Sequence, residues 1–480
     1  MKKILFCIIL LAAFLRLYQL TEIPPGLYSD EAMNGNNALQ ALTERHWQVF
    51  YTDNNGREGL FINIQSFFIA ILGNQPWVLR LPSALVGILT VLGIYYLTKS
   101  LFEKNKVDAN TIALLAAFFL ATSFWHINFS RIGFRAITAP FFLVWGIYFL
   151  LQSFNKEKMW FAILGGIAYG LGFHSYIAYR ATPLLIIFLG WWYWHTQPEK
   201  RLSLIKKLGV FIVFASIIFL PLVFYFFQNP ADFMGRTRQV SIFSSPTPIK
   251  DLSWNIVKTL GMFNIAGDFN WRHNIAGRPE LFWPVGIFFF VGIFSSLTYI
   301  IKNQKWFSPE LFLALWLGIT ALPVVISNEG IPHALRAIIM IPPIFIFAAI
   351  GAEKLHGILL KNLTPVWHKA SLVLFFSLFI FEAYYAYFVL WAGNPNTQNA
   401  FNADHFEISQ MLNQLPINQP KYVVVDTGAQ EFWQTFLPSQ TIMFLTNTMT
   451  SEKQKQKNLF YILPRDISSV PVGSYIATIK

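Results

Sequence analysis

Apolar runs about as long as a bilayer is thick recur along most of this chain. About 20 apolar residues cross the hydrocarbon core as one helix, because in lipid the backbone must satisfy its own hydrogen bonds. We therefore predict about eleven membrane spans, and they fall near residues 4–20, 78–98, 111–127, 137–152, 159–174, 181–195, 207–227, 281–301, 310–327, 335–352 and 369–391.

The composition agrees with a membrane protein. Of the 480 residues, 55% are hydrophobic and only 12% are charged, against about 25% charged in an ordinary soluble domain. The net charge of +12 is spread over many loops, so no basic arm for nucleic acid is predicted. The first run could instead be a signal peptide, but Arg16 interrupts the place where cleavage would occur, so we expect a span.

Lysines indicate the orientation of the predicted spans, since positive charge stays on the cytoplasmic side. The lysines gather in alternate loops, and these loops all face the cytoplasm if the N-terminus is cytoplasmic. An odd number of spans then leaves the C-terminal tail outside a cytoplasmic membrane. The lysines concerned are Lys99, Lys104, Lys106, Lys156, Lys158, Lys200, Lys206, Lys207, Lys302, Lys305, Lys354, Lys361 and Lys369.

Arginines dominate the loops on the other side. A topological signal needs only charge, whereas a planar guanidinium group suits bidentate binding of a phosphate. We infer an anionic ligand on the outer face. As an alternative, single arginines pair with outer carboxylates or reach toward lipid headgroups. The outer arginines are Arg45, Arg57, Arg131, Arg135, Arg180, Arg236, Arg238, Arg272, Arg278 and Arg336.

Three segments outside the spans are predicted to have structure of their own. The first outer loop, 21–77, contains a short helix beginning at Ser29 or Asp30 and an apolar stretch near 59–73 that suits an interfacial helix. The second long outer loop, 228–280, has the polar, Pro- and Gly-rich character of a lid or binding loop.

The tail, 395–480, is predicted to be a small extracytoplasmic α/β domain that follows a membrane domain over 1–394. "KYVVVDTG", "TIMFLT", "NLFYILP" and "SYIATIK" have the composition of short strands, and 402–414 that of a helix.

An acidic pair stands where the first span reaches the outer side, in "LYSDEAMNGNNALQA" from residue 27. Asp30 or Glu31 could take the proton of an attacking hydroxyl, while the other carboxylate orients a ligand or fixes a loop. The alternative is that both acids merely favour the first turn of a helix through its dipole.

Further polar residues lie on the same predicted side as the acidic pair. Arg131 and Arg135 are four apart, which places them on one face of a helix. Arginines near a carboxylate base suit a substrate whose leaving group is a phosphate. The candidate substrate-binding residues are Arg57, Arg131, Arg135, Tyr176, Arg180, His333 and Arg336, with His174, Tyr179, Asn328 and Glu329 beside them.

No metal or other cofactor is predicted. His174, His273 and His333 are scattered along the sequence without the spacing of a ligand cluster. Asp30 and Glu31 could hold a divalent ion, but adjacent residues at a helix start rarely both face one ion. The single cysteine excludes an intramolecular disulfide.

Several blocks resemble the bacterial branch of glycosyltransferase family 39, over about residues 1–350. The blocks are "IPPGLYSDEAMNGNNALQAL", "LRLPSALVGILTVLGIYYLTKSLF", "SRIGFRAITAPFFLVWGIYFLL", "GLGFHSYIAYRATPLL" and "EGIPHALRAIIMIPP". The resemblance implies a GT-C fold, an outer-face site and a polyprenyl-phosphate sugar as donor. It also implies that Asp30, with Glu31 beside it, is the catalytic carboxylate. Arg131, Arg135, Arg180 and Arg336 would hold the phosphate.

The resemblance implies a hydroxyl acceptor on a lipid, a glycan or a protein. The Trp-Trp-Asp-Tyr-Gly signature of the oligosaccharyltransferases is missing from the sequence, which argues against transfer to asparagine and against metal dependence. The rival hypothesis is a transporter or flippase for an anionic lipid, which would also need outer arginines, although inverted repeats are not evident. A scaffold whose tail binds a partner is a third possibility.

Overall fold

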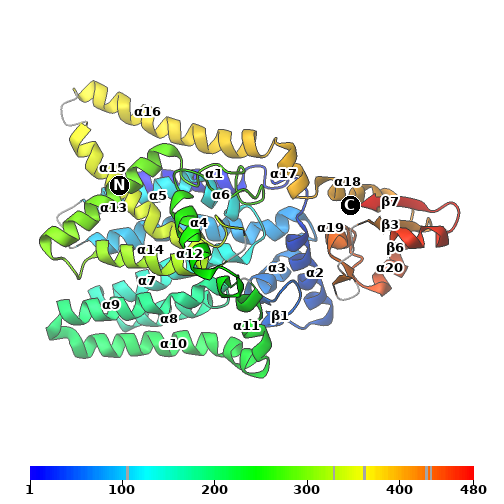
Figure 1. Cartoon of the computed structure of the whole chain (residues 1–480), viewed down its shortest axis with the longest axis horizontal. Coiled ribbons are helices and arrows are strands. Elements are labelled where there is room, and N and C mark those ends of the chain that lie inside the picture. Colours follow the sequence, from blue (N-terminus) through cyan, green and yellow to red (C-terminus); the bar gives the residue numbers. More distant parts are fainter. Residues whose placement is uncertain are drawn as a thin grey trace. The chain divides into compact units, whose positions relative to one another are not determined.

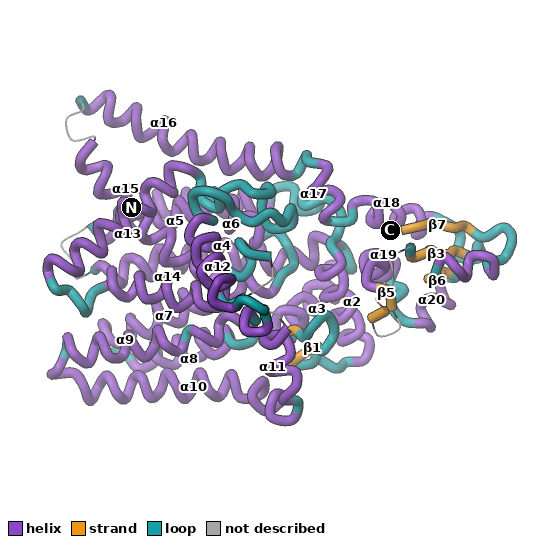
Figure 2. The backbone as a smooth tube through the Cα atoms, viewed as in Figure 1, coloured by secondary structure: helices purple, strands orange, loops and turns teal. Residues whose placement is uncertain are grey.

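The computed structural model describes residues 1–103, 108–239, 241–327, 330–359, 364–426, 431–432 and 435–479. Helices dominate the chain (Figure 1). Packing divides it into two compact units. The first comprises Met1–Tyr18, Ala84–Ser130 and Arg135–Tyr387, and the second comprises Gln19–Ser83, Arg131–Phe134 and Phe388–Lys480. Among the described residues, strands occur only in the second unit (Figure 2).

Each of the eleven predicted apolar segments forms a helix. They are α1 (Lys2–Leu17), α4 (Pro76–Phe102), α5 (Ala109–Thr122), α7 (Thr138–Lys156), α8 (Met159–Gly172), α9 (Pro183–Thr196), α10 (Arg201–Gln228), α13 (Trp283–Asn303), α14 (Pro309–Val325), α15 (Ile341–Leu359) and α16 (Pro365–Tyr384).

The predicted number of spans is not confirmed. Within the described residues, six helices are long and apolar enough to cross a membrane, or seven if α5 and α6 (Phe124–Ser130), bent by 62°, form one broken span. The helices α1, α8, α9 and α14 have 16, 14, 14 and 17 residues, which is shorter than the roughly 20 that a full crossing needs.

Small residues let neighbouring helices approach closely in the first unit. The helix α8 packs between α7 and α10, and α13 packs along α15. At the second of these contacts, a Cβ added to Gly292 would overlap the carbonyl of Phe347, and one added to Gly351 would overlap that of Phe288. Close backbone approach at glycines is typical of helix pairs in membranes, where van der Waals contact replaces the hydrophobic effect.

Gly292→Val should therefore separate α13 from α15 and destabilise the protein by about 1–3 kcal/mol, the usual range for overpacking. Gly318→Val in α14 is the matched control, because in the described part of the chain no atom outside its immediate neighbours and its own helix backbone lies within 4 Å of the position of its Cβ. The thermal unfolding midpoint of each variant in detergent measures the effect. Equal midpoints for the two variants would contradict the packing assigned to Gly292.

The break between α5 and α6 is stabilised by a buried arginine of α1. Arg16, 0% exposed, donates hydrogen bonds to the carbonyls of Leu120 and Ala121 at 3.2 and 3.1 Å, and lies 2.7 Å from Nδ1 of His126. The last carbonyls of a helix have no partner within it and carry partial negative charge. The guanidinium group of Arg16 supplies hydrogen bonds to these carbonyls, and the chain can therefore turn from α5 into α6.

The described part of the predicted lid, 228–280, includes the α-helices α11 (Pro230–Gln239) and α12 (Pro248–Gly261), and a loop then leads to α13. The residues named from the sequence that lie outside the described part of the chain are Lys104, Lys106, Asn328, Glu329 and Lys361, together with the side chains of Arg236 and Arg238.

The second unit contains the whole of the first outer loop, 21–77. The helix α2 (Ser29–Glu44) is followed by a hairpin of β1 (Phe50–Tyr51) and β2 (Arg57–Glu58) and by α3 (Leu60–Leu72). The two helices predicted in this loop are thus present. Their apolar faces share one core that includes Leu27, Ile62 and Phe444.

The tail folds as α17 (Pro395–Ala400), α18 (Ala403–Gln414) and a parallel sheet flanked by short helices. The sheet has the order β6-β3-β7, with β3 (Lys421–Val425) between β6 (Leu459–Ile462) and β7 (Tyr475–Ile479). Three of the predicted strands and the helix near 402–414 are present. The remaining elements are the β4 and β5 pair (Glu431–Phe432 and Thr435–Phe436), α19 (Gln440–Thr446) and α20 (Ser451–Lys457).

The strand predicted at "TIMFLT" is wrong, because this segment is the helix α19. A short apolar run that is buried on all sides has no periodicity to separate strand from helix. The helix packs on α2, where Asn36 donates hydrogen bonds to the carbonyl and the side chain of Gln440 at 3.1 and 2.8 Å. For this reason the first outer loop and the tail form one compact unit, and the predicted division at residue 394 stays a prediction.

Candidate functional site

Glu31 lies in a fully buried ion pair at the start of α2. Its two carboxylate oxygens accept hydrogen bonds from Nε and Nη2 of Arg80 at 3.0 and 3.1 Å. The backbone N–H of Gly133 donates to Oε1 at 2.6 Å. Both ionic side chains are 0% exposed. A carboxylate held in this way has no access to an acceptor hydroxyl, so this geometry does not fit a catalytic role for Glu31.

Arg80 extends the same network to the turn that precedes α2. Its Nη1 donates to the carbonyl of Pro24 at 2.7 Å, and its Nη2 to that of Gly26 at 2.9 Å. This arginine was not among the residues predicted from the sequence. A signal was available, because Arg80 interrupts the apolar run near 78–98, and charged residues within such runs are rare and usually functional or structural.

Asp30 has a different environment from its neighbour. Its side chain is only partly buried, and among the described residues it accepts one hydrogen bond, from Nδ2 of Asn54 to Oδ1 at 2.7 Å. The second carboxylate oxygen is therefore available to a ligand within the described structure. Of the two acids, Asp30 is the one that suits proton transfer.

Two of the predicted substrate-binding arginines make contacts within the second unit. Arg57, 3% exposed, donates to the side-chain oxygens of Asn34 and Asn37, both at 2.5 Å. Arg131, 0% exposed, donates to the carbonyl of Ile23 at 2.8 Å and lies over the ring of Phe388. Their burial and these contacts do not fit the substrate-binding role expected for them.

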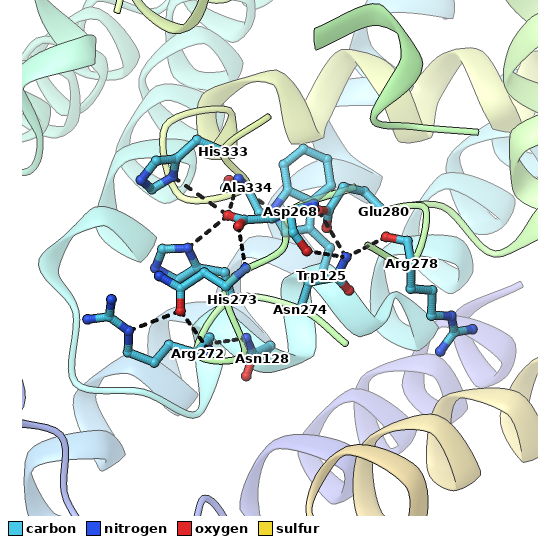
Figure 3. A network of polar contacts seen from close by, with 11 residues as sticks. Trp125, Asn128, Asp268, Arg272, His273, Asn274, Arg278, Glu280, His333 and Ala334 are labelled. Carbon is cyan, nitrogen blue, oxygen red and sulfur yellow. Dashed lines mark hydrogen bonds and ion pairs between the residues drawn. The ribbon is translucent and has the colours of Figure 1, made fainter. Parts of the chain in front are cut away.

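A second polar cluster, Asp268 with His273 and His333, lies in the first unit (Figure 3). Nδ1 of His273 lies 2.8 Å from Oδ2 of Asp268, and Nδ1 of His333 lies 3.8 Å from the same oxygen. The two imidazole rings are 4.9 Å apart between centroids. The interpretation of these histidines as scattered is wrong, because two loops about 60 residues apart in sequence meet here.

Hydrogen bonds from several segments of the chain hold this cluster in place. The backbone N–H groups of Ala334 and Asn270 donate to Asp268 at 2.9 and 2.8 Å. From α6, Trp125 donates to the carbonyl of Ala334 at 3.1 Å, and Asn128 donates to the carbonyl of Arg272 at 2.8 Å. The bent α5–α6 pair thus positions the residues next to both histidines (Figure 3).

The pKa values of Asp268 and His333 are both shifted by their surroundings. Burial alone would raise the pKa of Asp268, but the hydrogen bond and charge of His273, with the charge of His333, lower it overall. Burial, together with the charges of His273, Arg336 and Arg272, holds the pKa of His333 well below its usual range, although Asp268 opposes this shift. At neutral pH, His333 is therefore uncharged and Asp268 is ionised.

The other candidates of the first unit lie in separate places. Arg180, in a 3₁₀ turn (Ile177–Ala181), donates to the carbonyl of Phe233 at 3.1 Å and stacks on its ring. It borders an apolar pocket of about 520 Å³ that is otherwise lined by phenylalanine, valine and proline. Tyr176 begins the same turn and is half-buried.

Arg135, also half-buried, lies in the 3₁₀ turn before α7. Arg336 is largely buried, and its charge acts on His333. His174, the third of the histidines taken as scattered, lies 2.9 Å from the carbonyl of Ile218 through Nε2.

The fold is similar to those of two solved membrane proteins. The Archaeoglobus fulgidus oligosaccharyltransferase, in a complex with Zn and sulfate, matches with a TM-score of 0.57 and 15% identity over 96% of this chain and 62% of its own. ArnT from Cupriavidus metallidurans, bound to undecaprenyl phosphate, matches with a TM-score of 0.55 and 14% identity over 99% of this chain and 89% of its own. The chain is therefore a multi-span membrane protein with the predicted GT-C fold.

The family resemblance is confirmed for part of the chain. Residues 60–225 match the family described as dolichyl-phosphate-mannose-protein mannosyltransferase. YkcB of Bacillus subtilis (strain 168), a mannosyltransferase by name, is 25% identical over 218 residues. That match covers 43% of this chain and 29% of YkcB, so the chain spans less than a third of this relative.

Glu31→Gln should destabilise the protein by about 3–5 kcal/mol, because it leaves the charge of Arg80 buried without a partner. Adding Arg80→Met should restore part of the loss, since the unpaired charge is then removed as well. The exposed Glu44, at the other end of α2, provides Glu44→Gln as the matched control. Thermal unfolding in detergent gives the comparison, and a Glu31→Gln midpoint equal to that of Glu44→Gln would refute the structural role.

Proposed function

We propose that this chain is a glycosyltransferase that moves a sugar from a polyprenyl phosphate to a hydroxyl acceptor on the outer face of the cytoplasmic membrane. The observation that carries the proposal is the contrast between the acidic neighbours in a protein with the GT-C fold. Glu31 is buried and paired with Arg80, whereas Asp30 keeps an accessible carboxylate beside it. The family match and the ArnT complex with undecaprenyl phosphate support this class of donor.

In the proposed reaction the acceptor oxygen attacks C1 of the sugar, and the bond from C1 to the phosphate oxygen breaks. Asp30 takes the acceptor proton, and the polyprenyl phosphate leaves with the bonding electrons. Asn54 holds Oδ1 of Asp30 at 2.7 Å, which directs Oδ2 toward the incoming hydroxyl. The activated donor supplies the free energy, so the chemistry needs no nucleotide on that side.

Arg180 suits the lipid end of such a donor. A polyprenyl chain is apolar and ends in a phosphate, and this arginine borders a pocket whose other lining residues are apolar. We assign Arg135 and Arg336, with Tyr176, to contacts with the phosphate or the sugar. Arg57 and Arg131 act indirectly, because their side chains position α2 and the turn before it. Bulk lipids surround the helices, and the acceptor is a lipid, a glycan or a protein.

The orientation belongs to the same proposal. The lysine pattern favours a cytoplasmic N-terminus, so α2, Asp30 and the tail lie on the extracytoplasmic side. A transporter for an anionic lipid would leave the donor intact, and a scaffold would have no effect on it. Whether the donor is cleaved, moved intact or left unchanged therefore distinguishes a glycosyltransferase from a transporter and from a scaffold.

Asp30→Asn should lower the rate of sugar transfer by about 10²–10⁴-fold, the usual contribution of a general base, without lowering the unfolding midpoint. Asparagine keeps the side-chain shape and still accepts the hydrogen bond from Asn54. Asp404→Asn, at an exposed carboxylate in the first turn of α18, is the matched control. The assay counts free polyprenyl phosphate released by purified protein in detergent, and an unchanged rate for Asp30→Asn would exclude Asp30 as the base.

A further inference from the structure

The cluster of Asp268, His273 and His333 has the donor set of a metal site. Two imidazole nitrogens and one carboxylate oxygen are ligands that zinc and other first-row divalent ions accept, whereas magnesium and calcium prefer oxygen alone. One ligand atom from each residue lies within 4.8 Å of the other two. Both Asp268 and His273 are 4% exposed, so the donors lie away from bulk solvent.

The distances are close to those that a tetrahedral ion requires. Ligand atoms about 2.0–2.1 Å from zinc lie about 3.3 Å from one another in tetrahedral geometry. Oδ2 of Asp268 lies 2.8 Å from Nδ1 of His273 and 3.8 Å from Nδ1 of His333. Shifts of about half an ångström in two loop side chains bring these two of the three ligand pairs to the tetrahedral value, and the two imidazole nitrogens lie within 4.8 Å of each other.

One donor of the cluster has no hydrogen-bond partner. Nδ1 of His333 is buried and, among the described residues, makes no hydrogen bond, although it points toward Asp268 (Figure 3). An unsatisfied buried nitrogen costs free energy. A metal ion bound to it would remove this cost.

We propose that Asp268, His273 and His333 bind one divalent ion of the zinc type, with a fourth position open to water or to an anion. The ion would join the loop between α12 and α13 to the loop between α14 and α15. Trp125 and Asn128 supply the surrounding hydrogen bonds that hold both loops, as outer partners commonly do around metal ligands.

The charges around the cluster affect the choice of the fourth ligand. Arg272 and Arg336 both act electrostatically on His333, so they oppose a cation there. The buried carboxylate of Asp268 offsets part of this repulsion, and an anionic fourth ligand would offset more. This site is separate from the divalent-ion site that Asp30 and Glu31 could form. Metal binding at Asp268, His273 and His333 does not depend on the proposed transfer reaction.

The test is titration of the purified full chain with zinc in detergent, followed calorimetrically and by the metal that co-elutes on gel filtration. We expect one zinc per chain in the presence of excess magnesium. His333→Gln should weaken binding by more than about 100-fold, since even outer partners of a metal site contribute about 10- to 100-fold. His46→Gln, at an exposed histidine, should bind as the wild type does.

Cobalt gives a second readout that does not rely on variants. Cobalt bound by two imidazoles, a carboxylate and one further ligand in a tetrahedral site absorbs visible light strongly, and zinc should abolish that absorption by displacement. Gel filtration of His333→Gln shows whether the variant is folded. Wild-type protein that binds no zinc, or binds it as well after a folded His333→Gln substitution, would overturn the proposal.

Discussion

The buried pair of Glu31 and Arg80 is the interaction on which the proposed site depends. Removing two charges from water costs several kcal/mol for each ion, and only good geometry with further hydrogen bonds offsets that cost. Here the bidentate contact is completed by the N–H of Gly133 and by the carbonyls of Pro24 and Gly26. The pair therefore fixes the turn before α2, the first turn of that helix and the loop at residue 133. Asp30, one residue away, is held at a defined position with its carboxylate still accessible.

Much of the fold was predictable because hydropathy determines where helices form in lipid. All eleven apolar segments became helices, yet several are too short to cross a membrane fully, and run length alone does not show this. The bend between α5 and α6 was not predictable, since it depends on Arg16 of a distant helix reaching the last carbonyls of α5. The helix at "TIMFLT" was missed for a similar reason, because its packing against α2 decides its structure.

The candidate site was only partly predictable. Local pattern was enough to find the acidic pair, but the different environments of Asp30 and Glu31 depend on Arg80, about 50 residues later. Arg57 and Arg131 were expected to contact substrate, but both are buried and donate hydrogen bonds to other segments of the second unit, a role that a guanidinium group serves equally well. Asp268 and His273 join His333 only when two loops pack together, so their spacing in the sequence gave no sign of a cluster.

The proposed enzyme breaks the bond between sugar and lipid phosphate, whereas a transporter would leave that bond intact. The most direct test uses wild-type protein in vesicles, with a set of polyprenyl-phosphate sugars that each carry one label in the sugar and another in the phosphate. We expect the sugar label of one such donor to move to a hydroxyl acceptor while the phosphate label stays on the polyprenyl chain. Movement of the intact donor across the bilayer, with both labels still joined, would contradict it.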